Sequence, residues 1–406
     1  MPVDRRQFLR NAAGVAAIGR LGAVATAQTA EPTRALGASL RVDFPRTATQ
    51  TYLNSAGQHP LGRHVLRAME RHLHYEVFGS GEGRVYGVDE RGLKLRFGVL
   101  INADPDEIAF VQSTSDGENV VVAGMDLPRG GGNVVVDDLH FITSLYMYKT
   151  LEAKGLELRV VRHRDGAVRL ADFAAAIDAD TRLVSLALVS NVNGYLEEMR
   201  AVSDLAHDRG AYVYADLIQA VGAVPVDVRA LGIDFGAAAT NKWLMGERGF
   251  GLLYVRRDLQ DTVVPTTRWG HRHLWQFDQQ ALTWDPRPGA ARYETGHVSE
   301  PLAAAALAGV SYVDDLGVER IAAHAQRLID RLQTELPVLG YAPLTPVGNR
   351  SPIATFRAFR PSGPGDTFQR LSAANIAVGA GADYMRISVS VFNDDDDLDR
   401  LVAALG

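Results

Sequence analysis

The sequence predicts an α/β fold in which a large domain with a seven-stranded, mostly parallel sheet precedes a smaller C-terminal α+β domain. Three observations predict it. Seven short apolar runs alternate with longer stretches whose apolar residues recur at helical spacing. The alternation stops at a segment rich in Trp, His and Pro, from residue 268 to 292. A long helical pattern and two further apolar runs then complete the chain.

The predicted elements follow in chain order. The runs expected to form the large sheet are Glu107–Val111, Asn133–Asp137, Leu156–Val161, Arg182–Val189, Ala211–Asp216, Gly232–Thr240 and Gly249–Arg256. Because helices join these strands, we expect a parallel sheet that is covered on both faces. After these runs we expect a loop over residues 268–292 and a helix over Pro301–Leu336 that is broken at Gly317. We expect two further strands near Ile353–Phe359 and Met385–Val391, and a last helix near Leu398–Leu405.

The acidic run Asp394–Asp397 suits the start of that last helix, where carboxylates favour the positive end of the helix dipole. A calcium-binding loop is the alternative, but the run lacks the glycine and the terminal glutamate of such a loop. The domain boundaries that we predict are residues 31–60 for an N-terminal segment, 61–300 for the large domain and 301–406 for the small one.

Composition narrows the classes of function. The chain has 406 residues, a hydrophobic fraction of 47% and a formal net charge of −6, which suits a folded protein and argues against nucleic-acid binding. It contains no cysteine, so structural disulfides, thiolate metal sites and a cysteine nucleophile are excluded from this chain.

The N-terminus resembles a twin-arginine export signal over residues 1–30. Arg5 and Arg6 precede an Ala/Gly/Val stretch, and Ala25-Thr26-Ala27 supplies small residues at a plausible cleavage site. We therefore expect a periplasmic or exported protein, with a disordered basic tail on a cytoplasmic protein as the alternative. No run long enough to cross a membrane follows this segment, so we expect no membrane association after signal removal.

A lysine and an aspartate, 26 residues apart, each stand at the end of an apolar run. Asp216 ends Ala211–Asp216, and Lys242 follows Gly232–Thr240. Pyridoxal 5′-phosphate (PLP) chemistry needs a lysine that bonds to the aldehyde and a carboxylate that keeps the pyridine nitrogen protonated. A buried carboxylate is costly unless it is paired, and a pyridinium would be such a partner for Asp216. Gln219 could reach the phenolic oxygen of the same ring.

A phosphate anchor is expected where Ser113-Thr114-Ser115 opens a helix after the strand Glu107–Val111. Hydroxyls and free backbone N–H groups at a helix N-terminus bind anions. Simple helix capping remains the alternative for these residues.

The chain resembles the class V aminotransferase superfamily of fold type I PLP enzymes, in the branch that contains isopenicillin N epimerase and cysteine desulfurases. The resemblance runs from Tyr52 to the C-terminus. The segments that carry it are Ser190–Gly194, Asp216–Gln219, Thr240–Trp243 with Gly246 and Gly249, Arg292–Gly296, and Arg386–Ser388 with Phe392 and Asn393.

The resemblance implies roles for individual residues. Lys242 would hold the cofactor and move the Cα proton, with Asp216 at the pyridine nitrogen and Asn191 and Gln219 at the phenolic oxygen. Thr114, Ser115 and Thr240 would bind the phosphate, Phe141 would stack on the ring, and Arg386 would grip the substrate's α-carboxylate. Further substrate-pocket candidates, on segments that border the site in relatives, are Asn54, His59, Tyr86, Arg268, His271, His273 and Trp275. No metal site is predicted; His271 and His273 as metal ligands are a less favoured alternative.

The resemblance also implies an activity and a partner. We expect a PLP-dependent enzyme that acts at Cα of an amino acid, with epimerase-like or transaminase-type chemistry, and not a persulfide-forming cysteine desulfurase because the chain has no cysteine. A carbon–sulfur lyase, a periplasmic enzyme that tailors secondary metabolites such as siderophores, and a non-catalytic PLP-binding module are the alternatives. The family also implies a homodimer, in which His297 replaces the threonine that reaches the partner's phosphate in many relatives.

Overall fold

The computed structural model describes residues 34–79, 88–127, 129, 131–265, 270–358 and 364–406, which form one compact unit from Arg34 to Gly406. The predicted signal peptide, Tyr86 and Arg268 lie outside these described residues. Among the described residues no helix is long and apolar enough to cross a membrane.

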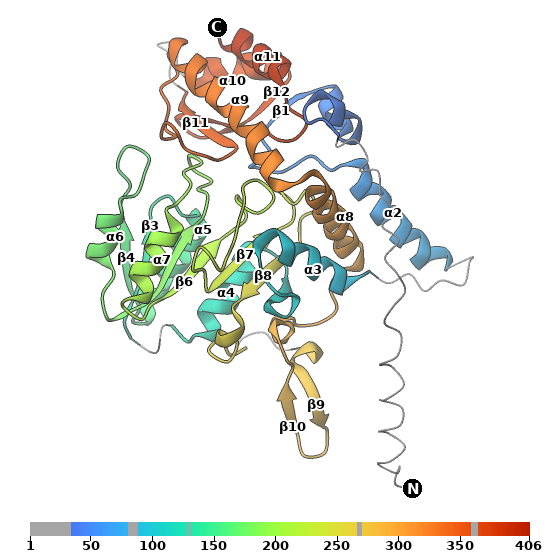
Figure 1. Cartoon of the computed structure of the whole chain (residues 1–406), viewed down its shortest axis with the longest axis vertical. Coiled ribbons are helices and arrows are strands. Elements are labelled where there is room, and N and C mark those ends of the chain that lie inside the picture. The colour runs from blue at the N-terminus through green and yellow to red at the C-terminus, as the bar shows by residue number, and fades with distance from the viewer. Residues whose placement is uncertain (1–33, 80–87, 128, 130, 266–269, 359–363) are drawn as a thin grey trace, which may run out of the picture. The chain divides into compact units, whose positions relative to one another are not determined.

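The predicted seven-stranded sheet is confirmed (Figure 1). Its strand order is β2-β8-β7-β6-β5-β3-β4. β7, β6, β5, β3 and β4 pair in parallel, whereas β8 pairs antiparallel with β7 and with β2. The bounds are β2 Ile108–Val111, β3 Asn133–Asp137, β4 Glu157–Val161, β5 Thr181–Ala187, β6 Tyr212–Asp216, β7 Phe235–Ala239 and β8 Gly251–Val255.

Both faces of this sheet are covered by helices, as the apolar runs predict. Alternate residues of β2 illustrate the arrangement, because Ile108 and Phe110 join one core cluster and Ala109 and Val111 the other. One cluster includes residues of α3 Glu90–Ile101, α6 Leu170–Ala176, α7 Met199–His207 and α8 Glu300–Leu316. The other includes residues of α4 Thr114–Gly124 and α5 Ile142–Leu151. α2 Arg63–Phe78 packs against α8.

The C-terminal part contains a four-stranded sheet of order β1-β12-β13-β11. Its strands are β1 Thr51–Leu53, β11 Ile353–Arg357, β12 Ile376–Ala380 and β13 Tyr384–Ser388, and its helices are α9 Val318–Val338, α10 Pro364–Ala373 and α11 Asp395–Leu405. β11 and β13 match the predicted strands. β1, from the predicted N-terminal segment, adds to this sheet by pairing in parallel with β12. Asp394 caps α11 through Asp397 N–H, which confirms that the acidic run begins the last helix.

The break predicted at Gly317 is confirmed, because this residue separates α8 from α9 with φ +82°. The loop predicted over residues 268–292 is partly wrong. It contains a two-stranded antiparallel hairpin, β9 Leu274–Asp278 and β10 Thr283–Pro286. The hairpin exposes large apolar side chains, namely Trp275, Phe277, Leu282 and Trp284. Because these apolar residues do not mark a buried face, the pattern did not predict a strand.

Candidate active site

Most of the predicted cofactor residues line one cavity of about 210 Å³ at the carboxyl ends of the parallel strands. Ligands of α/β proteins bind at this edge of the sheet. The cavity is lined by Ser113, Thr114, Ser115, Phe141, Ala187, Val189, Asn191, Asp216, Ile218, Gln219, Ala239, Asn241 and Lys242. The fold therefore brings together residues that lie more than a hundred positions apart in the sequence.

Asp216 and Lys242 reach the cavity from neighbouring parallel strands. Asp216 ends β6, opposite Ala237 of β7, and Lys242 follows β7 by three residues. Asp216 is only 4% exposed, and its Oδ1 accepts a hydrogen bond from Ile218 N–H at 2.9 Å. Burial raises the pKa of Asp216, although the nearby His140 and Lys242 act against that rise. Burial also lowers the pKa of Lys242 from 10.5 to about 8, with Asp216 opposing and Arg386 adding to the change.

The N-terminus of α4 borders the cavity where the phosphate anchor was predicted. Ser113 caps the helix by accepting Asp116 N–H at 3.0 Å, and Thr114 Oγ1 accepts Ala239 N–H at 3.0 Å, which ties α4 to the end of β7. The Thr114 hydroxyl keeps its own proton for a further acceptor. The helix approaches the sheet closely at Gly117, where a Cβ would lie 2.6 Å from the Cβ of Ala237. Capping and anion binding are therefore compatible at this N-terminus.

Gln219 is buried at the cavity wall with its amide held at both ends. Its Oε1 accepts the indole N–H of Trp243 at 2.8 Å, and its Nε2 donates to the carbonyl of Ala56 at 3.0 Å. Gln219 and Trp243 are each 1% exposed. The predicted contact between Gln219 and a ring oxygen stays a prediction, and the second amide hydrogen is the group that would make it.

Arg386 contacts Asn191, which lines the cavity, and Asn54 lies near Arg386, although neither Arg386 nor Asn54 lines the cavity itself. Arg386 Nη1 donates to the carbonyl of Asn191 at 2.6 Å, and a Cβ built on Gly379 would lie 3.1 Å from Arg386 Nε and 3.2 Å from Asn54 Oδ1. Both Arg386 Nε and Asn54 Oδ1 are buried without a hydrogen-bond partner among the described residues. Burial lowers the pKa of Arg386, and no described carboxylate pairs with it.

His59 is not among the residues that line the cavity, so its predicted contact with substrate stays a prediction. Its Nδ1–H donates to the carbonyl of Pro60 and its Nε2 accepts from Ser390 Oγ, both at 2.8 Å. The ring packs edge-on against Phe44 and Phe392, and burial lowers its pKa to about 4. Its neutral ring is thus a packing element, because both nitrogens are already engaged.

Thr240 also lies outside the cavity lining. Its hydroxyl donates toward the carbonyls of Glu247 at 2.8 Å and Phe250 at 3.2 Å, so its phosphate contact stays a prediction. His271, His273, Trp275 and His297 likewise do not line this cavity. His271 and His297 pack against each other with ring centroids 4.8 Å apart.

A buried polar network beneath the site was not foreseen from the sequence. Glu118 of α4 is 2% exposed and accepts hydrogen bonds from Ser144, Tyr148 and Ser185. His140 Nε2 lies 3.6 Å from Glu118 Oε1. Burial alone would raise the pKa of Glu118, but the hydrogen bonds with His140, Ser144 and Ser185 lower it. An acidic residue in a helix is usually exposed, so only the fold reveals this network.

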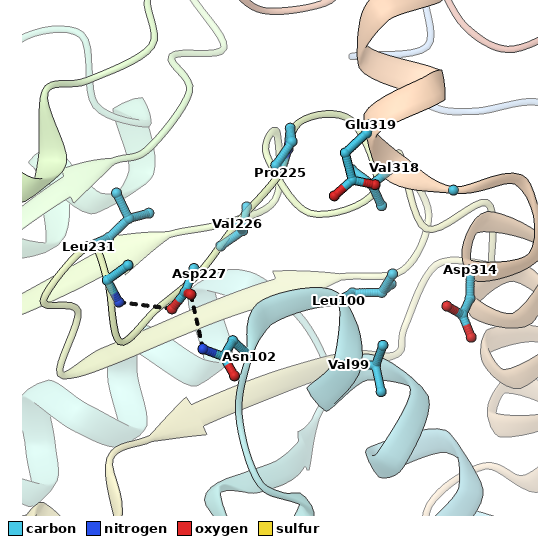
Figure 2. A pocket seen from close by; sticks show the side chains of 12 residues that line it. Val99, Leu100, Asn102, Pro225, Val226, Asp227, Leu231, Asp314, Val318 and Glu319 are labelled. Atoms are coloured by element: carbon cyan, nitrogen blue, oxygen red, sulfur yellow. Dashed lines mark hydrogen bonds between the residues drawn. The ribbon is translucent and has the colours of Figure 1, made fainter.

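A second cavity, of about 540 Å³, contains none of the predicted residues (Figure 2). It lies between α3, the segment after β6 and the start of α9. Asp227, Asp314 and Glu319 are its charged side chains, and Asp227 accepts a hydrogen bond from Asn102 Nδ2 at 2.9 Å. Its greater volume does not make it the active site, because no nucleophile or buried base faces it.

The residues of the smaller cavity fit PLP. Asp216 is a buried acceptor that no described cation bonds, which suits a protonated pyridine nitrogen. Lys242 has a lowered pKa, which suits bonding to an aldehyde. The N-terminus of α4 suits a phosphate, and Phe141 offers an aromatic face.

Comparison with known proteins identifies the family. The model of the class-V aminotransferases matches residues 52–401. A cysteine desulfurase of Klebsiella pneumoniae is 30% identical, over 84% of this chain and 86% of its own. A cysteine desulfurase of Haloferax volcanii is 28% identical, over 74% of each chain. The apo structure of a cysteine desulfurase from Thermococcus onnurineus NA1 superimposes with a TM-score of 0.82 at 23% identity and covers 92% of this chain and 98% of its own.

These relatives correct the function predicted from the sequence. The exclusion of cysteine desulfurases is wrong, because proteins of that name are among the relatives at about 30% identity. The exclusion relied on the missing cysteine, whereas the relationship depends on the cofactor site and the fold. Epimerase-like and transaminase-type chemistry are therefore set aside. The family match and the cavity together confirm the fold class and the cofactor, and the chain belongs to the class-V aminotransferase family of PLP-dependent enzymes.

Proposed function

We propose that this protein is a cysteine-desulfurase-type enzyme that breaks the carbon–sulfur bond of cysteine or a close derivative. The observation that supports an amino-acid substrate is Arg386, a half-buried guanidinium whose Nε is buried without a hydrogen-bond partner and which has no carboxylate partner among the described residues. An uncompensated buried charge is costly, and a bidentate carboxylate is the partner that best relieves that cost. The names of the relatives support the carbon–sulfur bond as the site of reaction.

Each site residue has a separate role in the proposed reaction. Bound PLP supplies an electron sink for the Cα substituents. Lys242, with a pKa of about 8, is the base that removes and returns the proton at Cα near neutral pH. Asp216 holds the proton of the pyridine nitrogen, the N-terminus of α4 holds the phosphate, and Arg386 orients the substrate so that its Cα–H faces Lys242.

The sulfur must pass to a thiol outside this chain, because the sequence contains no cysteine. The reaction is cysteine plus an acceptor thiol giving alanine plus the acceptor persulfide. The Cβ–S bond breaks, its electron pair stays with the amino-acid fragment, and the sulfur bonds to the acceptor. The acceptor's proton balances the hydrogen that the fragment gains at Cβ.

The test uses the PLP-loaded protein with L-cysteine and dithiothreitol as the acceptor thiol. We expect alanine in equal amount to the sulfide that the dithiol releases. Pyruvate and ammonia in place of alanine would overturn the proposal in favour of elimination. The matched variants are Arg386→Lys, which keeps the charge without the planar fork, and Arg386→Leu. We expect KM for cysteine to rise about tenfold or more in both, and more in the leucine variant.

We further propose that the protein works as a homodimer. Support comes from an exposed apolar stripe on α2, where Leu66, Leu73 and Val77 are 53%, 49% and 69% exposed at spacings that put them on one helix face. The measurement is the mass in solution by light scattering. A dimer that Val77→Glu weakens is the expected result, and a wild-type monomer with full activity would contradict it.

Export through the twin-arginine pathway is proposed from Arg5, Arg6 and the small residues that follow. We expect the native protein in the periplasmic fraction and the Arg5→Lys/Arg6→Lys variant in the cytoplasm. An unchanged distribution of the variant would contradict this location signal.

A further inference from the structure

The amide of Gln219 has an orientation that its neighbours dictate chemically. The indole N–H of Trp243 can only donate, so the atom that faces it at 2.8 Å must be the carbonyl oxygen of Gln219. The backbone carbonyl of Ala56 can only accept, so the atom 3.0 Å from it must be the amide nitrogen. The two contacts agree and exclude the flipped amide.

The remaining hydrogen of this amide belongs to a cavity-lining side chain. Nε2 carries two hydrogens, and Ala56 accepts one of them. Gln219 lines the same cavity as Asp216 and Lys242, so the second hydrogen is available to an acceptor there. With the amide flipped, a carbonyl oxygen would take its place and repel a negatively charged oxygen.

Trp243 and Ala56 are themselves held in place. A Cβ on Gly222, which has φ +86°, would lie 2.6 Å from the carbonyl oxygen of Trp243, so the backbone after Lys242 packs tightly here. Ala56 N–H donates to Ser388 Oγ at 2.9 Å. Ser388 lies on β13, two residues beyond Arg386. The Gln219 amide is therefore fixed from both sides of the site.

We propose that Trp243 is a positioning residue, which acts through Gln219 to present an amide N–H to the phenolic oxygen of PLP and to keep that oxygen deprotonated. The inference rests on the proposed function only in that it requires bound PLP, whatever the substrate. Trp243 directly follows Lys242, so the residue that would bind the cofactor and the residue that orients Gln219 belong to the same turn.

The experiment compares the absorption spectra of PLP-loaded variants without substrate. Trp243→Phe removes the indole N–H and keeps an aromatic ring in the core. We expect the share of cofactor with a protonated ring oxygen, read as the ratio of the near-ultraviolet to the visible band, to rise about tenfold, because a hydrogen bond to a charged group is lost. Gln219→Leu is expected to give a similar rise.

The double variant separates positioning from a general loss of structure. If Trp243 acts through Gln219, Trp243→Phe in the Gln219→Leu background adds no further change. A full additional change there, or a wild-type spectrum in Trp243→Phe alone, would overturn the proposal. Trp284→Phe, on the exposed hairpin, is the matched control, and we expect it to leave the spectrum unchanged. A wild-type protein with no lysine-dependent visible band would instead overturn PLP binding itself.

Discussion

The pKa of Lys242 gives a quantitative prediction for the capture of PLP by the apoprotein. Only the uncharged amine attacks an aldehyde. With a pKa of about 8, about one Lys242 in eleven is uncharged at pH 7, whereas the ordinary value of 10.5 would leave about one in three thousand. Burial of the side chain should therefore speed capture at neutral pH by about three-hundredfold relative to an exposed lysine with the same access.

The sign of the accompanying stability change follows from the same shift. Because the folded-state pKa lies below the unfolded one, the folded apoprotein binds fewer protons between pH 8 and pH 10.5. The cost of burying the ammonium is full below pH 8, about 3 kcal/mol, and disappears as the pH rises through 10.5. Lys242→Met should thus stabilise the apoprotein at pH 7 and have little effect at pH 11.

The assay is stopped-flow absorbance after mixing apoprotein with PLP over a series of pH values. The rate should rise with pH to a midpoint near 8, and the reaction of free N-acetyl-lysine amide with PLP corrects for the titration of PLP itself. Asp216→Asn should lower the midpoint, because Asp216 raises the pKa of Lys242, and Arg386→Leu should raise it. A midpoint near 10.5, or shifts of the opposite sign, would refute the reasoning.

Two further predictions concern the scaffold. Gly117→Ala should destabilise the protein by about 1–3 kcal/mol in urea denaturation, because its Cβ would lie 2.6 Å from the Cβ of Ala237. The control is Gly210→Ala, which has φ +81° but open space around it and therefore measures backbone strain without a clash. Glu294→Gln should lower the free energy of unfolding by about 3 kcal/mol or more, because this buried carboxylate accepts hydrogen bonds from Lys94 Nζ at 2.6 Å and from Arg272 Nη1 at 2.5 Å. The control is Glu319→Gln at an exposed position, and equal stability of the two variants would contradict this prediction.

The large sheet could be predicted because most of its strands are buried on both faces and therefore appear as continuous apolar runs, whereas β4 at its edge is buried only at Val161. Two other strand regions have weaker sequence signals for physical reasons. β12, Ile376–Ala380, has small residues with little burial contrast, and the β9–β10 hairpin exposes its apolar side chains. Neither contains the contrast between buried and exposed positions on which a strand prediction depends.

The candidate site could be predicted where a residue's role follows from its place at a strand end. Asp216 and Lys242 are such residues, and the cavity contains both. The surroundings of His59 could not be predicted from the sequence, because one of its ring nitrogens bonds to Ser390, which is 331 positions away. Glu118 was missed for a similar reason, since its partners come from α5 and β5.

The parallel pairing of β1 with β12 has a consequence for biosynthesis. Tyr52 lies opposite Ala377, so a ribosome must make more than three hundred further residues before the partner strand exists. The edge of β1 stays open to other chains throughout that interval. A chaperone that shields residues 51–53 until β12 has left the ribosome would suit this order of events.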